Sequence, residues 1–229
     1  MSENFEEEFS ASIKAMEKIH EQIESDLSKL EISETASSVL HEIYLHAVNF
    51  DANIQSLYIG FSSHPEDITA RNFFNGTVLT GIISAYENFS RRVLITIIKD
   101  AKLWSVAQSK RDSKRVWPIP DDRLNDRQNF INWAEGQGKL NDPRRISKIM
   151  NYYFHIPFPE IANVDSLIEI RNAFSHHGGC DKNGEMSISN EYVTNIFNDI
   201  ESYADTCLHS VNEHYRIAMA PITASLLGS

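Results

Sequence analysis

The sequence predicts an all-α protein built as an antiparallel helical bundle. Apolar residues recur at steps of three and four over several long segments, which is the spacing of helices with one buried face. Most of these segments are joined by short breaks, and short connections favour antiparallel neighbours. Apolar residues make up 41% of the 229 residues, which suffices for a sizeable core. We therefore expect a single domain over 1–229.

The first half of the chain predicts three helices. An N-terminal helical extension covers 1–32, a second helix covers 33–61 and begins at a serine cap, and a third covers about 69–104. Gly76 and Gly81 weaken the helical pattern in the early turns of the third helix. The apolar stripe of the extension consists of Phe5, Phe9, Ile13, Met16, Ile19, Ile23, Leu27 and Leu30.

The second half predicts an insertion followed by three helices. The insertion at 105–140 is partly irregular, and a short helix is expected within it at about 124–134. Helices are then expected at 142–154, 163–177 and 190–217. The first of these starts with Asp-Pro, an N-cap followed by proline at the first helical position. A tight glycine-rich connection separates the last two.

Charge is unevenly distributed along the chain. The net charge is −11, but the stretch 91–148 contains 14 Lys and Arg against 7 Asp and Glu. Either this is ordinary surface variation, or it marks a local basic surface that guides a polyanion such as RNA to one place. The residues that would form this RNA-binding surface are Lys110, Arg111, Lys114, Arg115, Arg144 and Arg145.

Several functional classes have no support in the sequence. There is no apolar run of 18 residues, so no membrane span is expected, and the acidic N-terminus does not resemble a secretory leader. Cys180 and Cys207 have neither metal-binding nor redox spacing, which favours a reduced, cytoplasmic protein without a metal or cofactor. We find no glycine loop for phosphates and no nucleophile motif.

The segment Arg171-Asn172-Ala-Phe-Ser-His176 has the composition of a phosphate-cleaving site. Guanidinium binds phosphate through a planar fork of N–H donors. Imidazole is the side chain whose unperturbed pKa lies closest to neutral, which suits proton transfer. The segment therefore combines charge stabilisation with acid–base chemistry.

A helical projection places Arg171 in the middle of an apolar face. Arginine is rarely buried without a partner, so a structural role would require an ion pair with another helix, and Glu87 is a candidate. The apolar face consists of Val164, Leu167, Ile168 and Phe174. The neighbouring polar stripe consists of Asp165, Glu169, Asn172 and His176.

The motif and its helical setting resemble the HEPN superfamily. The family motif is Arg, four to six residues and then His, with a polar residue favoured directly after Arg, and Arg171, Asn172 and His176 match it. The resemblance implies a HEPN-like helical bundle with metal-independent RNA endonuclease activity, as in toxin–antitoxin and phage-defence systems. It implies Arg171, Asn172 and His176 as catalytic residues, with Glu87 and His177 in support.

The resemblance also implies a homodimer with a composite active site. The two motifs would face each other across a two-fold axis, and the apolar stripe around Arg171 would belong to the interface. The implied reaction is attack of the RNA 2′-hydroxyl on phosphorus, leaving a 2′,3′-cyclic phosphate. An antitoxin or another defence-system protein is an implied partner.

Three alternatives remain open from the sequence. The chain could be a non-catalytic HEPN-like module that binds RNA or protein, or a regulatory helical protein such as an antitoxin or scaffold. The segment His41-Glu-Ile-Tyr-Leu-His46 resembles a zinc-binding helix, but its histidines are five positions apart instead of four. That offset turns them away from a common face, which favours a solvated helix edge.

Overall fold

The structure is a computed structural model, and it describes 36–63, 68–100, 103–104, 126–136, 140 and 142–214, together with residues 25 and 34. The described part is predominantly helical, which confirms the predicted all-α class. The principal helices are 36–63, α2 (Ile68–Ile98), α5 (Arg127–Gly136), α6 (Pro143–Phe154), α7 (Val164–His176), α8 (Asn190–Glu201) and 203–214. Two short strands, β1 (Cys180–Asp181) and β2 (Gly184–Glu185), pair as an antiparallel hairpin.

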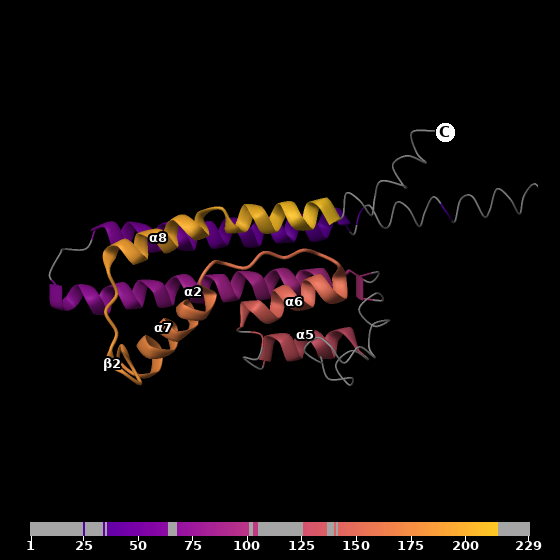
Figure 1. The fold of residues 1–229 in the computed structure, drawn as a ribbon. Helices are drawn as coiled ribbons and strands as arrows, with labels where there is room; N and C mark the ends of the chain where they lie inside the picture. The colour runs from indigo at the N-terminus through magenta and orange to yellow at the C-terminus, as the bar shows by residue number, and fades with distance from the viewer. Residues whose placement is uncertain are drawn as a thin grey trace, which may run out of the picture.

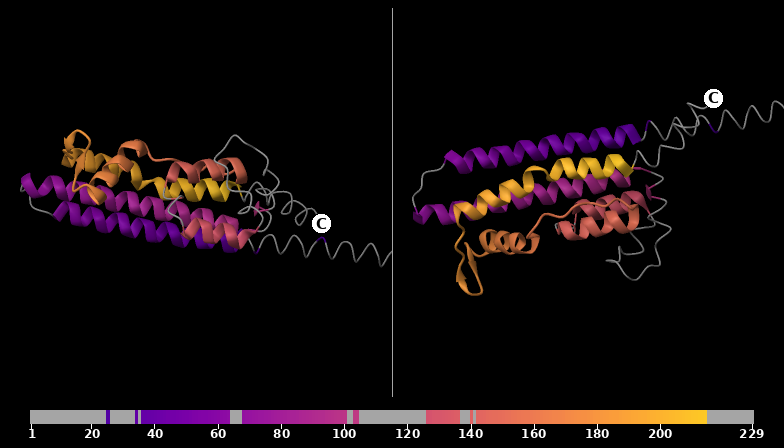
Figure 2. Two further views of the ribbon diagram at one scale, coloured as in Figure 1. Left: turned by 90° about the horizontal axis from the view of Figure 1, so that it is seen from below. Right: turned by 45° about the horizontal axis from the view of Figure 1, so that its top comes forward.

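Helix α2 lies at the centre of the bundle. The 36–63 helix runs beside it in the opposite direction, and α8 with the 203–214 helix covers the same side (Figure 1, Figure 2). Helices α5, α6 and α7 lie along the other side of α2 and contact it directly (Figure 1). Because neighbours cover α2 on both sides, several of its side chains are completely inaccessible to solvent, among them Leu79, Ile82, Ile83 and Val93.

Tyr203 occupies the point where these layers meet. Its ring packs edge-on against Tyr86 and Phe89 of α2, with centroids 4.7 and 5.9 Å away, and against Phe50 of the 36–63 helix at 6.1 Å. Its hydroxyl lies 3.1 Å from the hydroxyl of Ser90, which is also fully buried. Tyr203 thus joins three helices through apolar contact and satisfies a buried polar group.

Helix ends follow the sequence signals where caps are present. Asp142 caps α6 by accepting the N–H of Arg144, and Pro143 follows at the first position, as predicted. The predicted short helix of the insertion is observed as α5, and its Phe130 and Ala134 are buried against the core. The insertion therefore contributes to the bundle in its described part, while 105–125 and 137–139 lie outside the described residues.

The last helix differs from the prediction. It ends at Glu201 and resumes at 203, because Ser202 leaves the helical conformation with φ −94° and ψ 3°. The apolar spacing continues across this break, which explains why the sequence predicts one helix. The predicted extension at 1–32 lies outside the described residues, apart from residue 25.

The glycines of α2 allow close packing of neighbouring helices. A Cβ atom at Gly76 would lie 2.1 Å from the Phe174 ring of α7, and one at Gly81 would lie 2.9 Å from Leu57. Both glycines weaken the helical propensity of α2, but Gly76 lets the motif helix approach it closely and Gly81 does the same for the 36–63 helix. Gly60, on the 36–63 helix, has no heavy atom within 4 Å of such a Cβ among the described residues.

We expect Gly76→Ala to lower the free energy of unfolding and Gly60→Ala to raise it. The added methyl at Gly76 must displace the Phe174 ring, which costs about 1–3 kcal/mol and outweighs the gain in helix propensity. The same change at Gly60 meets no obstacle and gains about 0.5–1 kcal/mol. Denaturant unfolding of the two variants beside the wild type measures both effects. Equal stabilisation by both substitutions would contradict the close approach of α2 and α7.

Candidate functional site

The motif helix ends at a glycine pair that fixes the position of its last turn. Gly178 and Gly179 have φ values of +62° and +88°, a region that favours glycine. The amide N–H groups of His177 and Gly179 both donate to the carbonyl of Ala173, at 2.9 and 3.0 Å. These bonds satisfy the carbonyl of Ala173 at the helix end and accompany the turn of the chain into the hairpin, so the motif lies where helix and hairpin meet (Figure 1).

Arg171 forms an ion pair with Glu87 of α2, as predicted for an arginine in this setting. Its Nη1 donates to Glu87 Oε1, and its Nη2 donates to the side-chain oxygen of Asn172 at 3.2 Å. The side chains of Arg171 and Glu87 are 22% and 11% exposed. Among the described residues these two bonds use two of the five guanidinium N–H donors. The arginine is thus held in place while part of it still reaches the surface.

Arg171 lies at the edge of the buried face of α7, so its predicted position in the middle of that face is wrong. The projection omitted Ile170 and Ala173, which are buried together with Val164 and Leu167 and shift the centre of the face away from the arginine. Because α7 packs on α2 through this face, the face belongs to the core of the chain. Val164 and Leu167 of the predicted interface stripe are therefore packed inside the chain, whereas Ile168 and Phe174 are only partly buried, and the homodimer stays a prediction.

Glu87 sits in an environment that disfavours its charge. Burial raises the pKa of Glu87, and the Arg171 guanidinium offsets only part of this effect. Asp142 raises the pKa further, whereas Arg91 lowers it. Because the folded pKa lies above the unfolded value, the contribution of Glu87 to stability is greatest at acidic pH and falls as the pH rises through the folded pKa.

We expect the stability of Glu87→Gln relative to the wild type to improve as the pH rises from 4 to 7. Glutamine keeps an oxygen acceptor for Arg171 but has no charge to desolvate, so it lacks the pH-dependent loss that Glu87 causes. Denaturant unfolding at pH 4, 5.5 and 7 measures the difference. The exposed Glu169, changed to Gln, is the matched control. If the difference in free energy of unfolding between Glu87→Gln and the wild type stayed constant with pH, or changed in the opposite direction, the raised pKa of Glu87 would be contradicted.

His176 and His177 are both exposed at the end of α7. Their ring centroids are 6.3 Å apart with the planes inclined by 69°. Within the described part of the chain, the contacts of Arg171 lead to Glu87 and Asn172 and none leads to His176. One copy of the motif therefore holds a fixed guanidinium and an accessible imidazole on one helix without bringing them into contact.

A pocket of about 510 Å³ lies between α7 and the hairpin. Helix α7 contributes Glu169, Asn172 and Ala173 to its wall, and the chain after the helix contributes His177 and Lys182. The sequence did not predict this pocket, because the glycine-rich connection after α7 indicates only a tight turn, whereas it forms a hairpin with Lys182 and Asn183 as its loop. Asn172 belongs both to this pocket and to the contacts of Arg171, so the pocket adjoins the motif.

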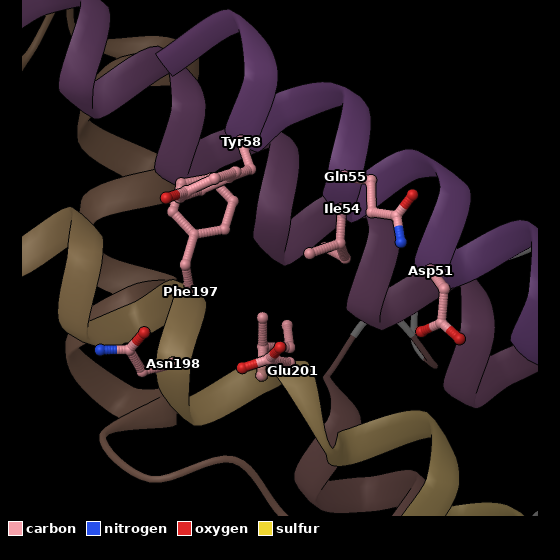
Figure 3. Close-up of a pocket in the computed structure, with 8 residues that line it drawn as sticks. Asp51, Ile54, Gln55, Tyr58, Phe197, Asn198 and Glu201 are labelled. Atoms are coloured by element: carbon pink, nitrogen blue, oxygen red, sulfur yellow. The ribbon is translucent and has the colours of Figure 1, made fainter. Parts of the chain in front are cut away.

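A second pocket, of about 390 Å³, lies between the 36–63 helix and α8 (Figure 3). Tyr58 and Phe197 form an aromatic wall, with ring centroids 5.2 Å apart, and Asp51 and Glu201 supply carboxylates. Burial and the neighbouring Asp205 raise the pKa of Asp51. With two carboxylates and no basic side chain among its lining residues, this pocket is unsuited to a phosphate.

The described part of the predicted basic surface is paired with carboxylates. Arg144 makes a two-bond contact with Asp142, at 2.8 and 2.7 Å, and also bonds to Asp165. Hydrogen bonding to Asp142 raises the pKa of Arg144. Arg145 lies 3.8 Å from the same carboxylate. The other four predicted residues, Lys110, Arg111, Lys114 and Arg115, lie outside the described residues.

The segment 41–46, which resembles a zinc-binding helix in sequence, does not form a metal site in the described chain. His46 lies 3.3 Å from the hydroxyl of Thr96 and 3.8 Å from Glu42, while His41 is exposed. Over the described ranges, no group of three or more His, Cys, Asp or Glu side chains is arranged to hold a metal ion. No described helix combines the length and apolar character that a membrane span requires.

Fold and site together define an α-helical bundle in which one helix, α7, carries an Arg–Asn–His motif on its outer side. Helix α7 carries this motif between the central helix α2 and a hairpin pocket. Comparison with family models, curated proteins and solved structures gives no match.

Proposed function

We propose that this chain is a metal-independent RNA endonuclease of the HEPN type, acting as a toxin or phage-defence effector. The observation that carries the proposal is the state of Arg171. Glu87 and Asn172 fix its orientation, yet most of its N–H donors are not used by these two bonds. A positioned guanidinium with spare donors is suited to a phosphate whose charge grows during reaction.

The proposed reaction needs a base, an acid and a phosphate clamp. The 2′-hydroxyl oxygen attacks the adjacent phosphorus, and an imidazole takes its proton. The bond from phosphorus to the 5′-oxygen breaks, and a second imidazole protonates that oxygen. The products are a 2′,3′-cyclic phosphate and a 5′-hydroxyl. His176 is exposed and available for the first role, and Arg171 with Asn172 would bind the phosphate.

A homodimer supplies the second imidazole. Two copies related by a two-fold axis would place both His176 side chains and both Arg171 side chains at one site, which accounts for the separation of the two groups within one copy. The exposed Phe73 adjoins the motif helix, with its ring 6.1 Å from that of Phe174, and is 57% exposed. A large exposed aromatic beside the motif helix suits an interface anchor.

The test is the end chemistry of RNA incubated with pure protein in EDTA. Wild type should give 2′,3′-cyclic phosphate and 5′-hydroxyl ends. Arg171→Lys should retain the positive charge beside Glu87 but lose the planar fork of N–H donors. Cleavage should therefore fall while the fold stays unchanged. Phe73→Glu should give a monomer by mass measurement and lose cleavage together with the dimer. Absence of cyclic ends, or equal cleavage by wild type and Arg171→Lys, would reject the proposal.

The ion pair itself favours a second candidate function. Arg171 already has a carboxylate partner, which is the arrangement of an arginine with a structural role. A non-catalytic helical module that binds RNA or a protein partner would contain the same pair. Such a module would bind RNA in the assay above without producing new ends.

A further inference from the structure

The pocket beside α7 has the volume of a small-molecule site. Its volume of about 510 Å³ falls within the range of small-molecule sites. It opens between Glu169 and Asn172 on the motif helix and Lys182 on the hairpin, with Met186 as an apolar surface. A flat aromatic ring with polar edges, such as a nucleobase, suits this mixture of apolar and polar groups.

The walls of the pocket are held in position before any ligand arrives. Asn72 of α2 donates to the carbonyl of Met186 at 2.8 Å and accepts from the amide of Ile188 at 2.7 Å, which fixes the exit of the hairpin. The amide of Met186 donates to the carbonyl of Gly179 at 2.9 Å and closes the base of the hairpin. A preformed pocket loses little conformational entropy on binding.

The charges in the pocket favour a base over a phosphate. Glu169 and Asp181 would repel a phosphate, and Lys182 compensates only one of them. Asp181 already accepts hydrogen bonds from the backbone and side chain of Asn183, at 2.6 and 3.3 Å. The exposed carboxylate of Glu169 is therefore the acceptor that a ligand would meet. A carboxylate accepts paired N–H donors side by side.

We propose that this pocket receives the nucleobase next to the scissile phosphate and that Glu169 selects guanine. The inference rests on the proposed nuclease function. Asn172 connects the proposed phosphate-binding group to the pocket, because it contacts the Arg171 guanidinium and also lines the pocket. Guanine presents an N1–H and an amino group side by side, which match the two carboxylate oxygens, whereas adenine, cytosine and uracil lack this pair. Single-stranded RNA is commonly read through such base edges.

The test is the distribution of cleavage sites in a random-sequence RNA. Wild type should cleave next to guanine in preference to the other bases. Glu169→Gln replaces one acceptor with a donor, and its preference for guanine should fall roughly 10- to 100-fold. Glu201→Gln, in the other pocket, is the matched control and should keep the preference of the wild type.

The outcomes separate the inference from the function on which it rests. If wild type produces cyclic ends without a guanine preference, or if Glu169→Gln keeps that preference, the inference fails and the nuclease function stands. If wild type produces no cleavage, both fail. Titration with guanosine 3′-monophosphate and cytidine 3′-monophosphate gives a second readout. Tighter binding of the guanosine compound, lost in Glu169→Gln and kept in Glu201→Gln, supports the inference, and equal binding overturns it.

Discussion

Replacing His176 with alanine is expected to slow RNA cleavage about 10²- to 10⁴-fold. This is the usual contribution of a side chain that transfers a proton in the rate-limiting step. The reaction has no other base in the proposed catalytic set, since Arg171 is cationic and Asn172 has no proton to exchange at neutral pH. The rate constant is best measured in single turnover, because slow product release would otherwise hide the chemical step.

The substitution should leave the fold intact. His176 is exposed at the end of α7, and surface substitutions usually change the free energy of unfolding by less than about 0.5 kcal/mol. His209 is an exposed histidine on the 203–214 helix and provides the matched control. His209→Ala should cleave like the wild type. Cleavage by His176→Ala within a factor of about three of the control would reject the assigned role, whatever its stability.

Replacing Tyr203 with alanine is expected to lower the free energy of unfolding by about 3–5 kcal/mol. The ring is 4% exposed and contacts Tyr86, Phe89 and Phe50, and a cavity at this point would loosen the contact of three helices. Such a loss is a large part of the stability of a typical domain. Denaturant unfolding measures the change directly.

Tyr203→Phe separates the ring from its hydroxyl. It keeps the aromatic contacts but removes the hydrogen bond with Ser90 and the one that Tyr203 donates to the carbonyl of Pro159 at 3.4 Å. The loss should cost about 1–2 kcal/mol because the serine hydroxyl stays buried. Tyr44 is 55% exposed, and Tyr44→Ala should change stability by less than about 0.5 kcal/mol. If Tyr203→Ala and Tyr44→Ala had similar effects, the core would not be centred on Tyr203.

The sequence determined the helices because helical spacing is a local property. The start of α6 follows from its Asp-Pro pair and the end of α7 from the Gly-Gly pair that comes directly after it. The break at Ser202 could not be predicted in this way, since the apolar spacing on both sides is continuous. The short hairpin has only two residues in each strand, which is too short for an alternating apolar pattern to predict it.

The site was predicted in its residues but not in its arrangement. The motif itself is contiguous in sequence, and the need of Arg171 for a carboxylate led correctly to Glu87. Which face of α7 is buried depended on Ile170 and Ala173 and on the approach of α2 at Gly76, and this moved Arg171 from the centre of the face to its edge. The hairpin pocket required contacts between the exit of the hairpin and Asn72, which is more than a hundred residues away in sequence.

By itself, the sequence determined an all-helical chain with an arginine, an amide and a histidine on one helix, because side-chain periodicity and motif spacing act over a few turns. Only the tertiary structure decided that the buried face of this helix packs in the core of the chain, that Glu87 forms an ion pair with the arginine, and that a pocket adjoins Asn172. The reason is physical. Burial, ion pairing and cavities depend on groups brought together from distant parts of the chain, and their energies are absent until the helices pack.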